Sequence, residues 1–402
     1  MISKQLNFHP YLFFRHTLLV VGVMLLLVSC DKNKEEPQPV NLHLISSEEI
    51  TEISQETLAA QLTELSPLLG GLAKNAVQVM RITYKTKDID GKEITASGAI
   101  FIPVTTDPAS MISVQHGTIM RDEEAPSYFS TQSRDASFGP LFGALGYILV
   151  YPDYIGYGAS KDSPHPYEHR ESLASASLDM IRAAKELLNS RPEITWNNNL
   201  YLAGYSEGGY ASMSLLKKIE DEAKNEVVLK AASCGAGAYD KTAFMNYIIN
   251  EPTEGIASNN RLYLWVLLSY DRIYGLNRPM SAYFKEPFAS QIAQNGLQTQ
   301  LDVSFNSIFN EAFVKGINDG TDTDFIAAVK DNNVFDWKPS TPLLLVHGDK
   351  DNTVFYFNTQ NAYNAMKARG ANVTLRTVEG GNHATTIETY LLQTYFFFEN
   401  NK

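Results

Sequence analysis

The 402-residue chain is 44% hydrophobic and 19% charged, a composition typical of a globular protein with a large buried core. Its net charge of −12 disfavours nucleic-acid binding, because a protein that follows phosphates needs a basic surface. The two cysteines, Cys30 and Cys234, are too few for a disulfide framework or a thiolate metal cluster.

The first 30 residues have the features of an export signal. Basic residues near the start precede an unbroken run of apolar or small residues over 18–28. This run is shorter than the roughly 20 residues that span a membrane, so we predict a signal peptide over 1–29. The run ends in Leu-Val-Ser-Cys at 27–30, which resembles the lipobox of bacterial lipoproteins. An ordinary signal peptide with a coincidental cysteine is the alternative.

The lipobox resemblance implies that Cys30 is acylated and anchors a cell-envelope lipoprotein. We expect the anchor at the outer membrane, with the protein on its periplasmic or external side. Residues 30–47 begin with a polar, proline-containing stretch and are predicted to form a solvated tether. Cys234 would then have no partner within the chain, and its small, apolar neighbours predict a buried core residue.

A helix and a hairpin are predicted next. Residues 48–70 carry four leucines at helical spacing, which predicts a helix on the surface of the fold or leading into it. Residues 77–84 alternate with the period of a strand, and 94–102 follow as a second strand after an Asp-Gly turn at 90–91. We expect these two antiparallel strands to open the domain.

Short apolar runs then alternate with helical patterns. The runs are 111–114, 147–151, 200–203, 227–232, 343–346 and 373–378. The helical patterns are 172–188, 206–219, 357–369 and 386–398. Parallel strands buried on both faces have such short apolar sequences. We therefore predict the α/β class, with a mostly parallel, doubly wound sheet.

One segment, residues 240–338, interrupts this alternation. It contains no strand series and is rich in tyrosine and phenylalanine. Because it lies between two predicted sheet strands, we expect it to form an inserted helical cap over one edge of the sheet. The core would then consist of residues 48–239 and 339–402.

The sequence Gly-Tyr-Ser-Glu-Gly at 204–208 matches the pattern G-x-S-x-G. A predicted strand ends immediately before it and a predicted helix follows, which is the setting of a nucleophile elbow. Glycines beside Ser206 tolerate the close approach of strand and helix around a strained serine backbone. We predict that Ser206 is a catalytic nucleophile; a structural Gly-Ser turn is the alternative.

A serine hydroxyl needs a base, and the base needs an orienting acid. His383 lies in a glycine-containing loop between the last predicted strand and helix, and is the candidate base. The stretch His-Gly-Asp-Lys-Asp-Asn-Thr-Val at 347–354 resembles the H-G-x-x-D-x-x-V signature of α/β-hydrolases, which assigns the acid to Asp351. Asp349 is the alternative acid, and His347 is expected to pack at the strand end.

An oxyanion hole needs backbone N–H groups where negative charge develops. The N–H of Glu207 follows the serine at the positive end of the predicted helix. The second donor is expected in the His-Gly-Thr loop at 116–118, which resembles the oxyanion loop of α/β-hydrolases. We assign it to Thr118, with Gly117 as the alternative.

With these motifs, the chain resembles a serine α/β-hydrolase over residues 76–400. Within it, Tyr-Pro-Asp-Tyr-Ile-Gly-Tyr-Gly at 151–158 and His-Pro-Tyr at 165–167 resemble the secretory lipase family, as does the opening hairpin. The resemblance implies an α/β-hydrolase fold that cleaves carboxylic esters, often lipids, under a helical cap. We expect no cofactor and no metal, because His165 and His169 lack a cysteine partner or an H-E-x-x-H pattern.

The predicted reaction is hydrolysis of a small-molecule or lipid ester through an acyl-enzyme on Ser206. Because fold and triad do not separate ester from amide cleavage, a serine peptidase or aminopeptidase is one alternative. Carboxylates in the cap, Glu251, Glu254 and Asp271, would then hold a substrate amine. A catalytically inactive surface lipoprotein that binds glycans or lipids is the other alternative.

Overall fold

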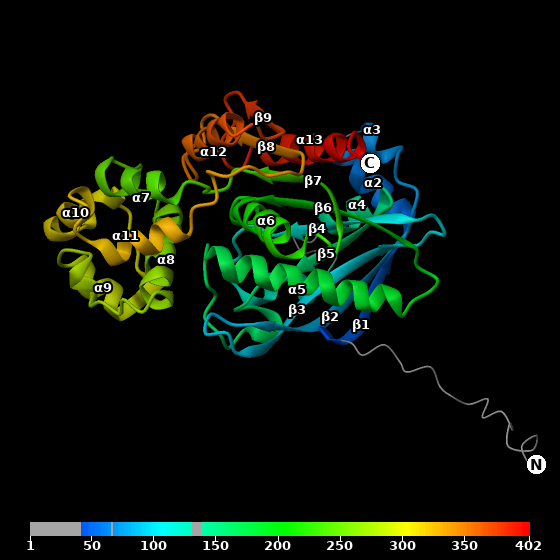
Figure 1. Ribbon diagram of the computed structural model, residues 1–402, viewed down its shortest axis with the longest axis horizontal. Coiled ribbons are helices and arrows are strands. Elements are labelled where there is room, and N and C mark those ends of the chain that lie inside the picture. Colours follow the sequence, from blue (N-terminus) through cyan, green and yellow to red (C-terminus); the bar gives the residue numbers. More distant parts are fainter. Residues whose placement is uncertain (1–41, 66, 131–137) are drawn as a thin grey trace, which may run out of the picture. The chain divides into compact units, whose positions relative to one another are not determined.

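The computed structural model describes residues 42–65, 67–130 and 138–402. Within this part of the chain, nine strands form one sheet in the order β1-β2-β3-β5-β4-β6-β7-β8-β9 (Figure 1). The strands are β1 (Leu44–Ile53), β2 (Val77–Lys87), β3 (Glu93–Pro103), β4 (Ala109–Gln115), β5 (Tyr147–Pro152), β6 (Trp196–Tyr205), β7 (Val228–Gly235), β8 (Leu343–Gly348) and β9 (Val373–Val378). Strands β4 to β9 pair in parallel, whereas β1, β2, β3 and the β3–β5 pair are antiparallel. The predicted mostly parallel α/β sheet is therefore confirmed.

The opening hairpin is confirmed, but a third antiparallel strand precedes it. Residues 44–53 pair with β2 as strand β1, where the sequence predicted the start of a helix at 48 and a tether up to 47. The helix begins only at Gln55. Most side chains of β1 are exposed, so this edge strand shows no alternation of apolar residues. Backbone hydrogen bonds to β2 hold it in place, and these do not depend on side-chain pattern.

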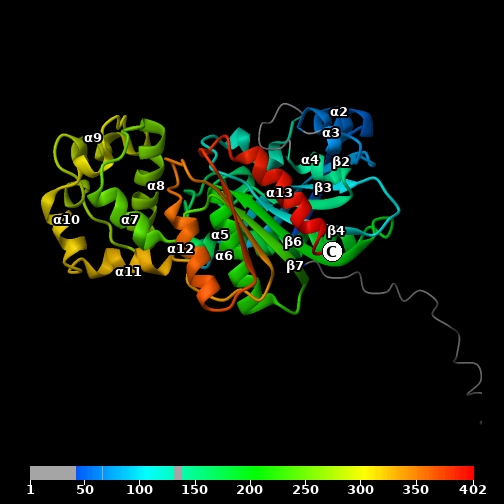
Figure 2. The same cartoon turned by 90° about the horizontal axis from the view of Figure 1, so that it is seen from above.

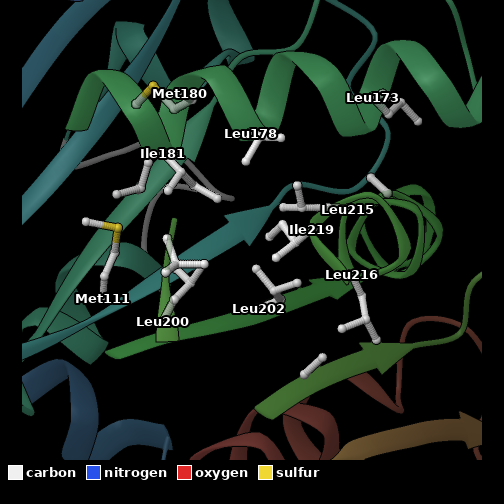
Figure 3. Close-up of a cluster of buried hydrophobic side chains, with 14 of the residues drawn as sticks. Met111, Leu173, Leu178, Met180, Ile181, Leu200, Leu202, Leu215, Leu216 and Ile219 are labelled. Carbon is white, nitrogen blue, oxygen red and sulfur yellow. The ribbon is translucent and has the colours of Figure 1, made fainter. Parts of the chain in front are cut away.

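Helices cover both faces of the sheet. On one face lie α5 (Arg170–Asn189), α6 (Glu207–Lys218) and α12 (Phe357–Ala368); on the other lie α2 (Gln55–Leu65), α3 (Pro67–Gly70), α4 (Phe138–Ala144) and α13 (Ile387–Glu399). Side chains of a strand alternate between faces, so Leu200 and Leu202 of β6 pack against the first layer while Tyr201 packs against the second. Figure 3 shows Met111, Leu200 and Leu202 pointing from β4 and β6 toward α5 and α6.

Between β7 and β8 the chain forms α7 (Lys241–Asn250), α8 (Ala257–Ile273), α9 (Phe288–Asn295), α10 (Glu311–Asn318) and α11 (Thr323–Asp331). We call residues 241–331 the cap. Its helices are grouped at one end of the sheet (Figure 2). They enclose their own apolar cluster, in which many aromatic rings touch edge to face. The helical character agrees with the sequence analysis, while the bounds 240–338 of the inserted cap stay a prediction.

The predicted signal peptide over 1–29 and the lipidation site Cys30 lie outside the described residues. No helix in 42–65, 67–130 or 138–402 is long and apolar enough to cross a membrane. Cys234, near the end of β7, is buried, as the sequence predicted.

Candidate active site

Ser206 occupies the sharp turn between β6 and α6. Its backbone has φ 63° and ψ −126°, a conformation that is costly for a residue with a side chain. A Cβ atom on Gly204 would lie 2.1 Å from the carbonyl oxygen of Gly208. A Cβ atom on Gly208 would lie 2.0 Å from the carbonyl oxygen of Gln115. The glycines of the motif are therefore required for the strand, turn and helix to pack this closely.

Ser206, His383 and Asp351 come together at this turn, although 177 and 32 positions separate them along the chain. The Nε2 atom of His383 is 2.8 Å from Oγ of Ser206. Its Nδ1 atom is 2.6 Å from Oδ2 of Asp351. With Nδ1–H donating to the carboxylate, Nε2 is free to accept the serine proton, which is the arrangement that acyl transfer requires.

The carboxylate of Asp351 is fully buried and has a partner on each oxygen. Its Oδ1 accepts the backbone N–H groups of Thr353 and Val354, at 2.9 and 3.0 Å. Its Oδ2 also accepts from Nε2 of His347, at 3.1 Å. Burial by itself raises the pKa of Asp351, but the hydrogen bonds from His347 and His383 outweigh it and hold the pKa below its usual range.

His347 therefore does more than pack at the strand end. Its Nε2 atom also lies 2.8 Å from the carbonyl oxygen of Val354, and its Nδ1 atom lies 2.7 Å from Oγ1 of Thr359. Because Nε2 faces two oxygens that only accept, it carries the proton, and Nδ1 accepts from the threonine hydroxyl. The sequence analysis did not anticipate the bond to Asp351, although the spacing of four residues was visible.

Asp349, the alternative acid, has a different partner. Its Oδ1 atom accepts the N–H of Gly380 at 2.7 Å, which ties the turn after β8 to the start of the loop that carries His383. The hydroxyl of Tyr205 donates to the carbonyl oxygen of His383 at 2.8 Å and supports the same loop. The geometry thus favours Asp351 as the acid and gives Asp349 a supporting contact.

Of the residues expected to supply the oxyanion hole, Glu207 and Gly117 lie beside the serine, and Thr118 lines the same cavity. Glu207 is the first residue of α6, where N–H groups have no partner within the helix. A Cβ atom on Gly117 would lie 3.8 Å from Cβ of Ser206, so the 116–118 loop passes close to the nucleophile. The side chain of His116 supports this loop, with its ring nitrogens 2.7 Å from the carbonyl oxygen of Gly117 and 3.1 Å from that of Asp153.

Two cavities meet at Ser206. The first, which we call the apolar pocket, extends from the serine into the cap and is narrow, with about 60 Å³ open to the centre of a water molecule. Its aromatic lining consists of Tyr167, Phe244, Tyr263, Tyr270, Phe305, Phe309, Phe313 and Phe325. The second, the open cleft, is larger, about 410 Å³ by the same measure, and more polar. It is lined by Gly117, Thr118, Ser258, Asn259, Thr353 and His383 among others.

A buried ion pair lies in the wall of the apolar pocket. Nζ of Lys241 bonds the carboxylate of Glu168, and both side chains are at least 94% buried. Burial raises the pKa of Glu168 and lowers the pKa of Lys241, and each partner opposes the shift of the other. Sequence analysis missed the pair because its members are 73 positions apart and neither belongs to a motif of known chemistry.

The two histidines considered for a metal have other partners. His165 bonds the carboxylate of Glu207 at 2.8 Å, and His169 bonds the hydroxyl of Ser172 at 2.6 Å. Over 42–65, 67–130 and 138–402, no three His, Cys, Asp or Glu side chains are arranged to hold a metal ion.

Known proteins resemble this chain in sequence and in fold. The sequence model of the secretory lipase family matches residues 125–390. A search of curated proteins found no match. Among solved structures, a candidate hydrolase from Legionella pneumophila is 27% identical, with a TM-score of 0.77, and the alignment covers 89% of this chain and 98% of that one.

Two further structures are similar. The rice cell wall degrading esterase LipA from Xanthomonas oryzae is 25% identical, with a TM-score of 0.71 and coverage of 89% of this chain and 96% of that one. Lipase A from Candida antarctica, in its closed state, is 16% identical, with a TM-score of 0.64 and coverage of 90% and 82%, which shows a shared fold alone. These neighbours share the α/β-hydrolase fold expected from the sequence.

Proposed function

Because the chain belongs to the secretory lipase family, and is therefore a carboxylic ester hydrolase, we propose that it works as a serine esterase whose nucleophile is Ser206. The observation that carries the proposal is the continuous hydrogen-bonded chain from Oγ of Ser206 through His383 to Asp351, with links of 2.8 and 2.6 Å. These distances allow a proton to leave the serine as its oxygen attacks a carbonyl.

The proposed reaction has two halves. Oγ of Ser206 bonds the ester carbonyl carbon while His383 takes the hydroxyl proton, and the N–H groups of Glu207 and Thr118, or of Gly117, receive the negative oxygen. His383 then gives the proton to the leaving alcohol oxygen, which leaves an acyl-serine. A water molecule attacks this ester with His383 again as the base, and the acid is released with Ser206 restored.

The two cavities divide the substrate between them. We assign the acyl chain to the apolar pocket, because its aromatic and aliphatic lining replaces water around hydrocarbon. We assign the alcohol to the open cleft, because its mouth is wide and Ser258, Asn259 and Thr353 offer polar groups. The substrate class that fits is an ester of an apolar acid.

Replacing the nucleophile tests the mechanism. Ser206→Ala is expected to lower kcat on p-nitrophenyl esters by about 10⁴- to 10⁶-fold and to abolish labelling by a fluorophosphonate probe. Ser214→Ala is the matched control: this serine is on the same helix, and its hydroxyl bonds the carbonyl oxygen of Tyr210. Full activity in Ser206→Ala would overturn the proposal, and a wild-type protein that the probe does not label would favour the inactive-lipoprotein alternative.

Peptide cleavage receives less support than ester cleavage. The described residues that line the two cavities do not include Glu251, Glu254 or Asp271. Asp271 accepts the hydroxyl of Tyr283 at 2.6 Å inside the cap, and Glu254 bonds the amide of Asn352. A paired assay with an acyl ester and the matching aminoacyl amide is expected to show hydrolysis of the ester; a higher kcat/KM for the amide would reverse the assignment.

Membership in a secretory family supports export of the chain. We further propose that Cys30 carries the lipid anchor, for which the support is the Leu-Val-Ser-Cys sequence at 27–30. Cys30→Ser is expected to prevent incorporation of radiolabelled palmitate and to release the protein from the membrane fraction. Labelling that persists in the variant would contradict the assignment of Cys30.

A further inference from the structure

The loop over residues 165–168, His-Pro-Tyr-Glu, has no part in the proposed triad, yet its three ionisable or polar side chains are all buried. It lies between β5 and α5 in the chain and contacts both the active site and the cap. We call it the HPYE loop. Its contacts in the two directions are specific enough to suggest a role in catalysis.

Toward the active site, the HPYE loop holds both residues assigned to the oxyanion hole. Nε2 of His165 is 2.8 Å from the carboxylate of Glu207, and the two side chains are 3% and 1% exposed. The hydroxyl of Tyr167 is 2.8 Å from Oγ1 of Thr118. One loop therefore bonds the side chains of the two residues whose backbone N–H groups face the reacting carbonyl in the proposed mechanism.

His165 is itself held in place. Its Nδ1 atom is 2.7 Å from the carbonyl oxygen of Ile155, so the ring lies between a carbonyl and a carboxylate. These contacts hold in place the side chain of Glu207, the first residue of α6. Supporting contacts of this kind hold a catalytic group within about 0.5 Å of its productive position.

Toward the cap, the same loop is held by two helices. The indole of Trp265 on α8 stacks on the ring of Tyr167, with centroids 4.5 Å apart and planes 13° apart, and meets the ring of His165 edge to face at 5.5 Å. Lys241, the first residue of α7, makes the buried ion pair with Glu168. The hydroxyl of Tyr270 on α8 donates to the carbonyl oxygen of Glu168 at 3.0 Å.

We propose that the HPYE loop is a positioning element that aligns the oxyanion donors and makes their alignment depend on the cap. The proposal rests on the serine mechanism above and goes beyond it. Tyr167 and Glu168 also line the apolar pocket, so an acyl chain that enters the cap contacts the loop. Binding energy from the acyl chain can thus improve the fit to the transition state, which raises kcat and not only affinity.

The hydroxyl of Tyr167 provides the first test. Tyr167→Phe keeps the ring on Trp265 and removes only the bond to Thr118, so kcat is expected to fall about tenfold with KM almost unchanged. Thr118→Val is expected to cause a similar fall, Thr118→Ser to restore most of the rate, and the double variant to be no slower than either single variant. Tyr147→Phe is the matched control, because that buried hydroxyl bonds Glu399 instead.

Each other outcome of this test overturns the proposal or its premise. A rise in KM with unchanged kcat would show that Tyr167 only lines the pocket. Additive losses of kcat in the double variant would show that the Tyr167–Thr118 bond is not the cause of either loss. An active Ser206→Ala protein would defeat the serine mechanism itself. If Ser206→Ala is inactive and Tyr167→Phe is fully active, the serine mechanism stands and the positioning role of the HPYE loop is contradicted.

Trp265 tests the link to the cap, because it contacts the HPYE loop but is not among the residues that line either cavity. Trp265→Ala is expected to lower kcat roughly five- to tenfold even for an acetyl ester, whose acyl group is too short to use the pocket. Trp265→Phe is expected to keep most of the rate. Trp337→Ala, which removes an indole that stacks under Lys217, is the control for folding. If Trp265→Ala loses kcat only with long-chain esters, the cap does not control the alignment of the oxyanion donors.

Discussion

The core and the cap are held together by different kinds of contact. In the core, the candidate catalytic residues follow the ends of β6, β8 and β9, and short, directional hydrogen bonds fix their side chains. In the cap, aromatic rings pack edge to face around a cavity whose lining is mostly apolar. Directional bonds fail when an atom moves by less than an ångström, whereas apolar packing changes more gradually with size and shape.

This difference separates reactivity from selectivity. A substitution in the core is expected to change the rate for every ester alike, because the same bonds serve every substrate. A substitution in the pocket wall of the cap is expected to change which ester reacts fastest. The HPYE loop is one place where the two regions meet, and there we expect a cap contact to alter the chemistry itself.

The largest effect is expected for the buried acid of the core. Asp351→Asn presents an amide to His383 in place of a carboxylate, which favours the wrong imidazole tautomer and lowers kcat by about 10⁴-fold for short and long esters alike. Asp349→Asn is the matched control, because its amide oxygen still accepts the N–H of Gly380 and activity should stay within about threefold. If the two variants lose similar activity, the acid has been misassigned.

A smaller and selective effect is expected in the cap. Val266 on α8 lines the apolar pocket, so Val266→Phe fills part of the space assigned to the acyl chain. The ratio of kcat/KM for a decanoyl ester to that for an acetyl ester should fall about 10- to 100-fold. Val314→Phe makes the same change in α10 at a position that does not line the pocket, and should leave the ratio unchanged. If the two variants have equal ratios, the acyl chain does not bind in the apolar pocket.

The smallest effect is expected for His347, and it should depend on pH. The hydrogen bond from His347 lowers the pKa of Asp351, so its loss in His347→Gln raises that pKa. The carboxylate is then protonated at a higher pH than in the wild type, so the loss of kcat/KM relative to the wild type should grow as the pH falls. At neutral pH the loss should be only about threefold. His43→Gln, at the edge of the sheet, is the control, and a profile of unchanged shape would contradict the role of His347.

Much of this architecture could be predicted from local sequence. Short apolar runs identified β4 to β9 because strands buried on both faces exclude polar residues. The motif around Ser206 was informative because glycines are needed wherever backbones approach closely, and the structure meets that need at Gly204 and Gly208. His383 and Asp351 could be proposed from chain order and from a signature. Strand β1 was missed because its exposed side chains leave no apolar pattern.

Other features arise only when distant segments meet. The pairs His165–Glu207, Tyr167–Thr118 and Glu168–Lys241 join positions 42, 49 and 73 residues apart, and no spacing rule connects them. Which aromatic residues line the pocket and which fill the cap depends likewise on how five helices pack. Local patterns report which residues can take part in chemistry, because backbone strain and burial constrain residue type position by position. Which groups touch is decided by packing across the whole fold, because side-chain contacts depend on three-dimensional distance and not on separation along the chain.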